Sequence, residues 1–252
     1  MAKLITVTSG KGGVGKTTTA INLAAAINGF GKEVIVLDAN LTTPNLGLHL
    51  GAPIVPVSLN HVLFGKARIA DAIYEHESGT KIVPSSLSIR DLRRINGNGK
   101  LKEIGKKLKK ISDYVIFDSA AGLGDEAIAA LDAADEIVIV TNPEIPAVTD
   151  ALKTSKLAEQ LGKEVKGVIV NRVRNSKSEM PISNVSEMLE LPILGVVPED
   201  ENVPVSVTMK DALVHTHPRS GASRAYRQIA AKIIGKNDYR EKRGFFDWIF
   251  GG

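Results

Sequence analysis

The stretch SGKGGVGKTT, residues 9 to 18, constrains the fold more than any other part of this chain. It satisfies the phosphate-loop pattern G-x-x-x-x-G-K-[ST], in which glycines let backbone N–H groups approach phosphates and the lysine binds the β- and γ-phosphates. An apolar run precedes the loop and a helical pattern follows it, as the motif requires. We therefore expect a nucleotide here, contacted by Gly10, Lys11, Gly12, Gly13, Val14, Gly15, Lys16, Thr17 and Thr18.

Short apolar, β-branched runs recur along the chain with amphipathic segments between them. They are LITVTS (4–9), EVIVLD (33–38), TKIVPS (80–85), DYVIFDS (113–119), EIVIVT (136–141), VKGVIVN (165–171) and ILGVVP (193–198). Nearly continuous apolar strands that alternate with helices indicate a parallel sheet covered on both faces. The predicted fold class is α/β: a P-loop NTPase three-layer sandwich with a mostly parallel, twisted sheet and helices on both faces.

Composition sets the domain organisation and excludes several classes of function. With 252 residues, 43% of them hydrophobic, the chain suits one large domain over residues 1–235 and a tail over 236–252. The absence of cysteine excludes disulfides, thiolate-bound iron–sulfur clusters and thiol catalysis. No signal peptide and no run of about 18 apolar residues is visible, so we expect a cytoplasmic protein. The net charge of +4 favours an anionic surface, either lipid or nucleic acid.

Two aspartates end neighbouring predicted strands beside the phosphate loop. Hydrolysis of a γ-phosphoryl group requires Mg²⁺, cations and a positioned water. Asp118, which ends DYVIFD, suits the role of holding the metal through its water shell, and Asp38 ends EVIVLD. The predicted metal site therefore comprises Thr17, Asp38 and Asp118, and Lys16 and Asp118 are candidate catalytic residues.

Two later strand ends are candidates for recognition of the base. Asn171 and Arg172 end VKGVIVN, while Pro198 and Glu199 follow ILGVV. Ligands of open α/β sheets lie outside the carboxyl ends of the strands. An Asn side chain offers a donor and an acceptor to a base edge, and an Arg plane stacks on a ring. Ordinary turn chemistry is the alternative interpretation.

The end of the chain has an unusual composition. Four of the seven Phe and Trp residues fall in the last eight positions, after a basic stretch. On a helix, the large apolar residues would share one broad face, as in helices that lie in a lipid interface. We expect membrane contact from Arg240, Lys242, Arg243, Phe245, Phe246, Trp248, Ile249 and Phe250.

Taken together, the loop KGGVGKTT, the strand-end motifs and the basic-aromatic tail resemble the MinD/ParA family of ATPases over nearly the whole chain. The resemblance implies that the base is adenine and that the ligands are ATP and Mg²⁺. It also implies that Lys11 reaches the nucleotide of a second subunit, so that ATP is sandwiched in a homodimer. Such proteins attach to the inner face of the cell membrane when ATP-bound, and a protein partner stimulates hydrolysis or is positioned.

The chain departs from the family at the first switch. Members usually carry D-x-D there, whereas this chain reads Asp38-Ala39-Asn40, with Asn45 further on. An amide hydrogen-bonds a water but does not accept its proton. The resemblance thus adds Lys11 and Asn40 to the catalytic candidates Lys16 and Asp118, and we expect slow turnover and a long-lived ATP-bound dimer. Ala120, where the second switch commonly has proline, is a milder departure.

Three other functions are alternatives to the predicted one, a MinD-like ATPase that positions division or surface machinery. A ParA-like partition ATPase would use the basic segment 100–110 to bind nonspecific DNA, although Leu101, Ile104, Leu108 and Ile111 indicate an amphipathic helix there. An iron–sulfur reductase lacks its cysteines. A metabolic kinase or ligase does not explain Lys11. We expect no specific nucleic acid.

Overall fold

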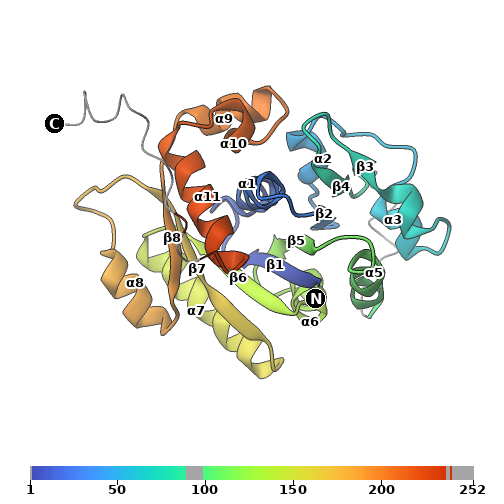
Figure 1. The fold of residues 1–252 in the computed structure, drawn as a ribbon. Coiled ribbons are helices and arrows are strands. Elements are labelled where there is room, and N and C mark those ends of the chain that lie inside the picture. Colours follow the sequence, from blue (N-terminus) through green and yellow to red (C-terminus); the bar gives the residue numbers. More distant parts are fainter. Residues whose placement is uncertain (1, 89–98, 237–238, 240–252) are drawn as a thin grey trace.

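The protein was analysed as a computed structural model that describes residues 2–88, 99–236 and 239 (Figure 1). Helices and strands alternate through most of the chain. The elements are β1 Lys3–Ser9, α1 Lys16–Gly29, β2 Val34–Ala39, α2 Leu46–His49, α3 Leu59–Leu63, η1 Ile69–Ala72, β3 Tyr74–Glu75, β4 Lys81–Val83, α5 Lys100–Leu108, β5 Tyr114–Ala121, α6 Asp125–Ala133, β6 Glu136–Thr141, α7 Ile145–Gln160, β7 Glu164–Val173, α8 Ile182–Leu189, β8 Ile193–Pro198, α9 Asn202–Thr208, α10 Leu213–Thr216 and α11 Gly221–Ile233.

The strands form one sheet in the order β3-β4-β2-β5-β1-β6-β7-β8. Neighbouring strands run parallel except for the edge pair, in which β3 is antiparallel to β4. All seven predicted strands are present, which confirms the predicted fold class. The two-residue strand β3 was not predicted, because a segment this short has no periodicity to recognise.

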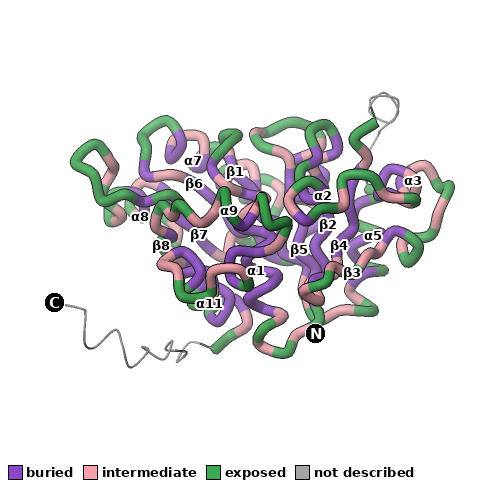
Figure 2. Tube along the Cα trace, turned by 90° about the horizontal axis from the view of Figure 1, so that it is seen from above, coloured by how far each residue is buried: buried purple, intermediate pink, exposed green. Residues whose placement is uncertain are grey.

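Helices cover both faces of the sheet and enclose two apolar cores. One core joins α1, α10 and α11 to the sheet, and the other joins α5, α6, α7 and α8 to its opposite face. Figure 2 shows α1 enclosed in the molecule, with exposed segments at the rim. The Ala-rich sequence of α1 suits this place, since small side chains let the helix approach both the sheet and α11.

The basic segment before β5 forms the predicted amphipathic helix, α5. Leu101, Ile104 and Leu108 are buried in the core. The inclusion of Ile111 in this apolar face was wrong: the helix ends at Leu108, and Ile111 is 56% exposed.

No helix among the described residues is long and apolar enough to cross a membrane. The last helix among the described residues is α11, and the chain then turns at Gly235, whose φ is +81°. The ring of Tyr239 packs edge-on against that of Phe30, just after α1, with centroids 5.0 Å apart. The eight predicted membrane-contacting residues, from Arg240 to Phe250, lie outside the described residues.

Candidate functional site

The predicted phosphate loop connects the end of β1 to the start of α1 near the middle of the sheet. Lys16 is the first residue of α1, and burial lowers the pKa of its ammonium group, although nearby Asp118 opposes this. Gly15 precedes it with φ +98°, and Gly13 has φ +80°. The loop thus brings a buried cation and a helix N-terminus together, which is an arrangement that binds phosphate.

Two glycines of the loop leave no room for a side chain. A Cβ at Gly15 would lie 2.2 Å from Nδ2 of Asn171, and one at Gly10 would lie 2.1 Å from the backbone oxygen of Asp150 in α7. Gly10 therefore lets α7 approach the loop, while Gly15 needs both a left-handed backbone and space.

The described residues fit Mg²⁺ beside the loop. Asp118 is 1% exposed; its Oδ2 accepts the Thr17 hydroxyl at 2.6 Å, while Oδ1 is buried without a hydrogen-bond partner. Asp38 pairs with Asp118 in the register of β2 and β5 and is also fully buried. Burial raises the pKa of Asp118 to about 6, and burial together with Asp118 raises the pKa of Asp38. Two buried carboxylates and a hydroxyl, with one carboxylate oxygen unpaired, form a hard oxygen donor set that suits this cation.

Asp38 also organises the first switch. Its Oδ1 accepts the N–H of Asn40 at 3.2 Å, and its Oδ2 accepts those of Asn45 and Leu46 at 3.1 and 3.0 Å. The side chain of Asn40 turns to its own loop: Nδ2 donates to the Thr43 carbonyl at 2.7 Å, and Oδ1 accepts from the Thr43 N–H and hydroxyl. Both ends of the Asn40 amide are thus occupied, and its role toward water stays a prediction.

The second switch runs from Asp118 into α6. Gly122 has φ +82°, and its N–H donates to the Ser9 carbonyl at 3.0 Å, which ties this segment to the phosphate loop. On the first turn of α6, the Glu126 carboxylate accepts hydrogen bonds from Leu41 and Thr42 of the first switch. No sequence pattern points to a role for Glu126, because an acidic residue on a first helical turn is common.

The predicted base-reading residues lie at the carboxyl ends of β7 and β8. Asn171 is buried, and its Nδ2 donates to the Val14 carbonyl at 2.8 Å, so it supports the phosphate loop. The backbone carbonyl of Asn171 accepts a hydrogen bond from Nδ2 of Asn142 at 2.9 Å. Arg172 is exposed with φ +58°, a conformation rare for a non-glycine residue. Recognition of a base by these two side chains stays a prediction.

Pro198 and Glu199 lie beside this edge. The Glu199 N–H donates to the Val173 carbonyl at 3.0 Å, which joins the ends of β8 and β7. The next residue, Asp200, accepts N–H groups from Asn202 and Ala222 at 3.0 and 3.2 Å. It thereby fixes the starts of α9 and α11 beside the predicted base site.

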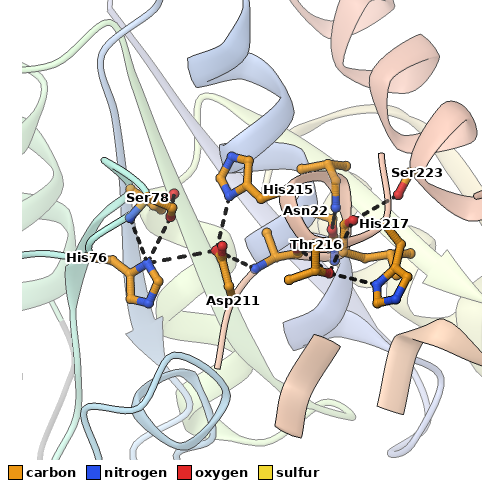
Figure 3. A network of polar contacts seen from close by, with 12 residues as sticks. Asn22, His76, Ser78, Asp211, His215, Thr216, His217 and Ser223 are labelled. Carbon is orange, nitrogen blue, oxygen red and sulfur yellow. Dashed lines mark hydrogen bonds and ion pairs between the residues drawn. The ribbon is translucent and has the colours of Figure 1, made fainter. Parts of the chain in front are cut away.

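A polar network secures the segment after α9 (Figure 3). The Val214 N–H donates to Oδ1 of Asn22 in α1 at 3.1 Å, and Asn22 donates to the Thr18 carbonyl at 2.8 Å. Asp211 contacts His215 at 3.0 Å and His76, next to β3, at 3.8 Å. The phosphate-loop helix and the sheet edge are thus both connected to this segment.

Lys11 differs from Lys16 in its surroundings. Its side chain is 48% exposed, and Nζ lies 3.9 Å from Oε2 of the exposed Glu144, which precedes α7. Such a surface pair is weak. The two lysines of the loop are therefore placed for different contacts, one within the site and one at its rim.

This fold and site define a P-loop nucleotide-binding protein. The sequence model of the CobQ/CobB/MinD/ParA nucleotide-binding domain matches residues 5–212, so the chain belongs to that family. An ATP-binding protein of Methanocaldococcus jannaschii is 43% identical over 93% of this chain and 89% of its own length. The septum site-determining protein MinD of Neisseria meningitidis is 34% identical over the full length of both chains.

A solved structure also shows the similarity of this chain to MinD. Septum site-determining MinD from Pyrococcus horikoshii, complexed with Mg-ADP, matches with a TM-score of 0.89 and 32% identity, over 96% of this chain and 100% of that one. The predicted MinD/ParA resemblance is confirmed, and with it the expected class of ligand, an adenine nucleotide with Mg²⁺.

Proposed function

We propose that this protein is a MinD-like ATPase in which ATP and Mg²⁺ close a homodimer and the paired tails attach it to a membrane. The observation that carries the proposal is the pair of lysines in one loop. Lys16 is buried in its own site, whereas Lys11 is exposed at the rim, 3.9 Å from Glu144. A second, outward-facing cation beside the phosphates is available to a nucleotide held by another subunit.

In ATP hydrolysis, the described residues have separate roles. Lys16 and the loop N–H groups hold the phosphates, and Thr17 and Asp118, with Asp38 beside them, hold Mg²⁺. Bound Mg²⁺ neutralises charge that develops on the phosphoryl oxygens. Turnover is slow, because the position that would orient the attacking water carries Asn40, an amide already bonded to Thr43.

The tail at residues 236–252 forms the membrane switch of this proposal. Burial of a large apolar side chain contributes roughly 1.5–3 kcal/mol, and each basic residue near an anionic leaflet adds about 1 kcal/mol. Ordering a tail of about ten residues costs about 1–2 kcal/mol per residue. One tail is therefore marginal, whereas two tails on one dimer bind more tightly through effective concentration. A protein partner either stimulates hydrolysis or is itself positioned by the ATPase. In the second case the partner belongs to the cell-division or surface machinery.

Sedimentation with anionic liposomes tests the membrane switch. We expect the full chain to pellet in Mg-ATP but not in Mg-ADP, and a chain ending at Tyr239 to stay in solution in both. A full chain that stays in solution in both nucleotides would refute the switch. DNA binding by the basic segment 100–110 would then be the next function to test, although Lys102 and Lys109 of that segment pair with Asp132 and Asp135.

Light scattering of Lys11→Ala tests the dimer. The variant should still bind ATP, because Lys16 and the loop N–H groups remain to hold the phosphates, but it should remain a monomer in Mg-ATP. An ATP-dependent dimer of the variant would contradict the proposed role of Lys11.

A further inference from the structure

Glu126 connects two segments that are far apart in the sequence. Its Oε2 accepts the N–H groups of Leu41 at 3.0 Å and Thr42 at 3.2 Å, and its Oε1 accepts the Thr42 hydroxyl. Leu41 and Thr42 directly follow Asn40 in the first switch. Glu126 lies on the first turn of α6, two residues after Gly124. One carboxylate therefore connects the loop after β2 to the helix that the second switch enters.

This contact is more specific than the general preference of helices for acidic residues on their first turn. Asp125, the neighbouring acidic residue of that turn, is exposed, and its side chain makes no hydrogen bond or ion pair with any described residue. Glu126 instead makes three charge-assisted hydrogen bonds to the first switch, and such bonds are stronger than neutral ones.

Leu41 is buried in the core, but residues 40–44 have few hydrogen bonds to segments outside the first switch. Residues 40–44 otherwise form their hydrogen bonds within 38–46: Asn40 bonds to Asp38 and Thr43, and Asn45 bonds to the Thr43 carbonyl. Among the described residues, Glu126 is the hydrogen-bond partner of residues 40–44 from outside that range. The position of Asn40 relative to the phosphate loop thus depends on α6 as well as on β2.

We propose that Glu126 is a positioning residue that couples the two switches, so that a movement of the second switch on binding ATP moves the segment carrying Asn40. The Glu126 carboxylate bonds to Leu41 and Thr42 and acts through them. The inference rests on the proposed ATPase function, and it adds the residue through which the two sides of the site respond together.

Three variants separate this role from a structural one. Glu126→Ala removes all three hydrogen bonds. Glu126→Gln keeps them, because the amide oxygen accepts the two N–H groups and the amide nitrogen donates to the Thr42 hydroxyl. Asp125→Ala is the matched control, since it removes one negative charge from the same helical turn without touching the first switch.

ATP hydrolysis, ADP binding and thermal stability are measured on the full-length chain and each variant. Single-turnover hydrolysis of ATP should fall at least about tenfold in Glu126→Ala, with the ADP dissociation constant within about threefold of wild type, because positioning is lost while the phosphate loop is intact. Glu126→Gln should restore most of the rate, and Asp125→Ala should keep it. Melting temperatures check that all three variants are folded.

Hydrogen exchange measures the coupling between the two switches without requiring ATP hydrolysis. In wild type, residues 39–46 and 118–124 should both change protection between ADP and a non-hydrolysable ATP analogue. In Glu126→Ala, only residues 118–124 should still respond. If both segments respond as in wild type, or if Glu126→Gln behaves like Glu126→Ala, the inference is wrong. A wild-type chain that binds no ATP, or shows no response in either segment, would instead refute the proposed function itself.

Discussion

Asp118→Asn should stabilise the nucleotide-free protein although it damages the site. Asp118 is buried, its Oδ2 accepts the Thr17 hydroxyl, and its Oδ1 has no hydrogen-bond partner. Burial raises the pKa of this carboxyl from the ordinary 3.8 to about 6. The folded chain therefore binds a proton more tightly here than the unfolded chain does, and the free energy of unfolding falls as pH rises from about 4 to about 6.

The size of the effect follows from that shift. A displacement of about two pH units corresponds to about 3 kcal/mol of lost stability above pH 7, of which about half is already lost at pH 5. Asparagine stays uncharged, but its buried N–H₂ group has no acceptor, which costs about 1–2 kcal/mol. Asp118→Asn should thus be more stable than wild type by about 1–2 kcal/mol at pH 8, and this advantage should be about 1.5 kcal/mol smaller at pH 5.

Denaturant unfolding in EDTA at pH 5 and pH 8 measures both quantities. At pH 8 the melting temperature should rise by about 4 °C in the variant. In buffer without EDTA, addition of Mg-ADP at 100 times its dissociation constant should stabilise wild type by about 2.7 kcal/mol and the variant by clearly less. Asp125→Asn, which removes a surface charge, is the matched control.

The outcome that refutes this reasoning is specific. An advantage of Asp118→Asn that does not grow between pH 5 and pH 8 would mean that the buried carboxylate does not destabilise the fold. An equal response of wild type and variant to Mg-ADP would mean that Asp118 does not hold the metal.

Three further predictions follow from the site and the core. Asn40→Asp should raise the rate of ATP hydrolysis at least about tenfold, since a carboxylate accepts a proton from water, and an unchanged single-turnover rate would refute the proposed cause of slow turnover. Gly15→Ala should abolish nucleotide binding in calorimetry, because a Cβ there would lie 2.2 Å from the Asn171 side chain, while the open position Gly29→Ala should keep binding. At the start of β6, burial would raise the pKa of Glu136, but the hydrogen bond from Lys3 and the ion pair with Lys166 outweigh it and lower that pKa. Glu136→Gln should therefore cost about 1 kcal/mol at pH 7, and this loss should shrink in unfolding experiments as pH falls below about 4.5.

The sequence was sufficient where a residue's role depends on its immediate neighbours. The alternation of apolar runs predicted every long strand, and the glycine pattern predicted the loop from Gly10 to Thr17 at the start of α1. Asp38 and Asp118 were also predicted as neighbours, because each ends a strand beside that loop, and the register of β2 and β5 confirms the pairing. Prediction was wrong for Ile111, where the apolar spacing continued past the residue at which the helix ends.

What the tertiary structure alone decided concerns contacts between residues far apart in the chain. The sequence determined which segments form strands and which groups can hold a phosphate, since these depend on local periodicity and side-chain chemistry. It gave no sign that Asn171 supports the Val14 carbonyl or that Asn40 turns to Thr43. Nor did it indicate that Glu126 holds a loop 84 residues earlier. A carboxylate on a helix has many possible donors, and only the packing of α6 beside the end of β2 brings one set of them within hydrogen-bond distance.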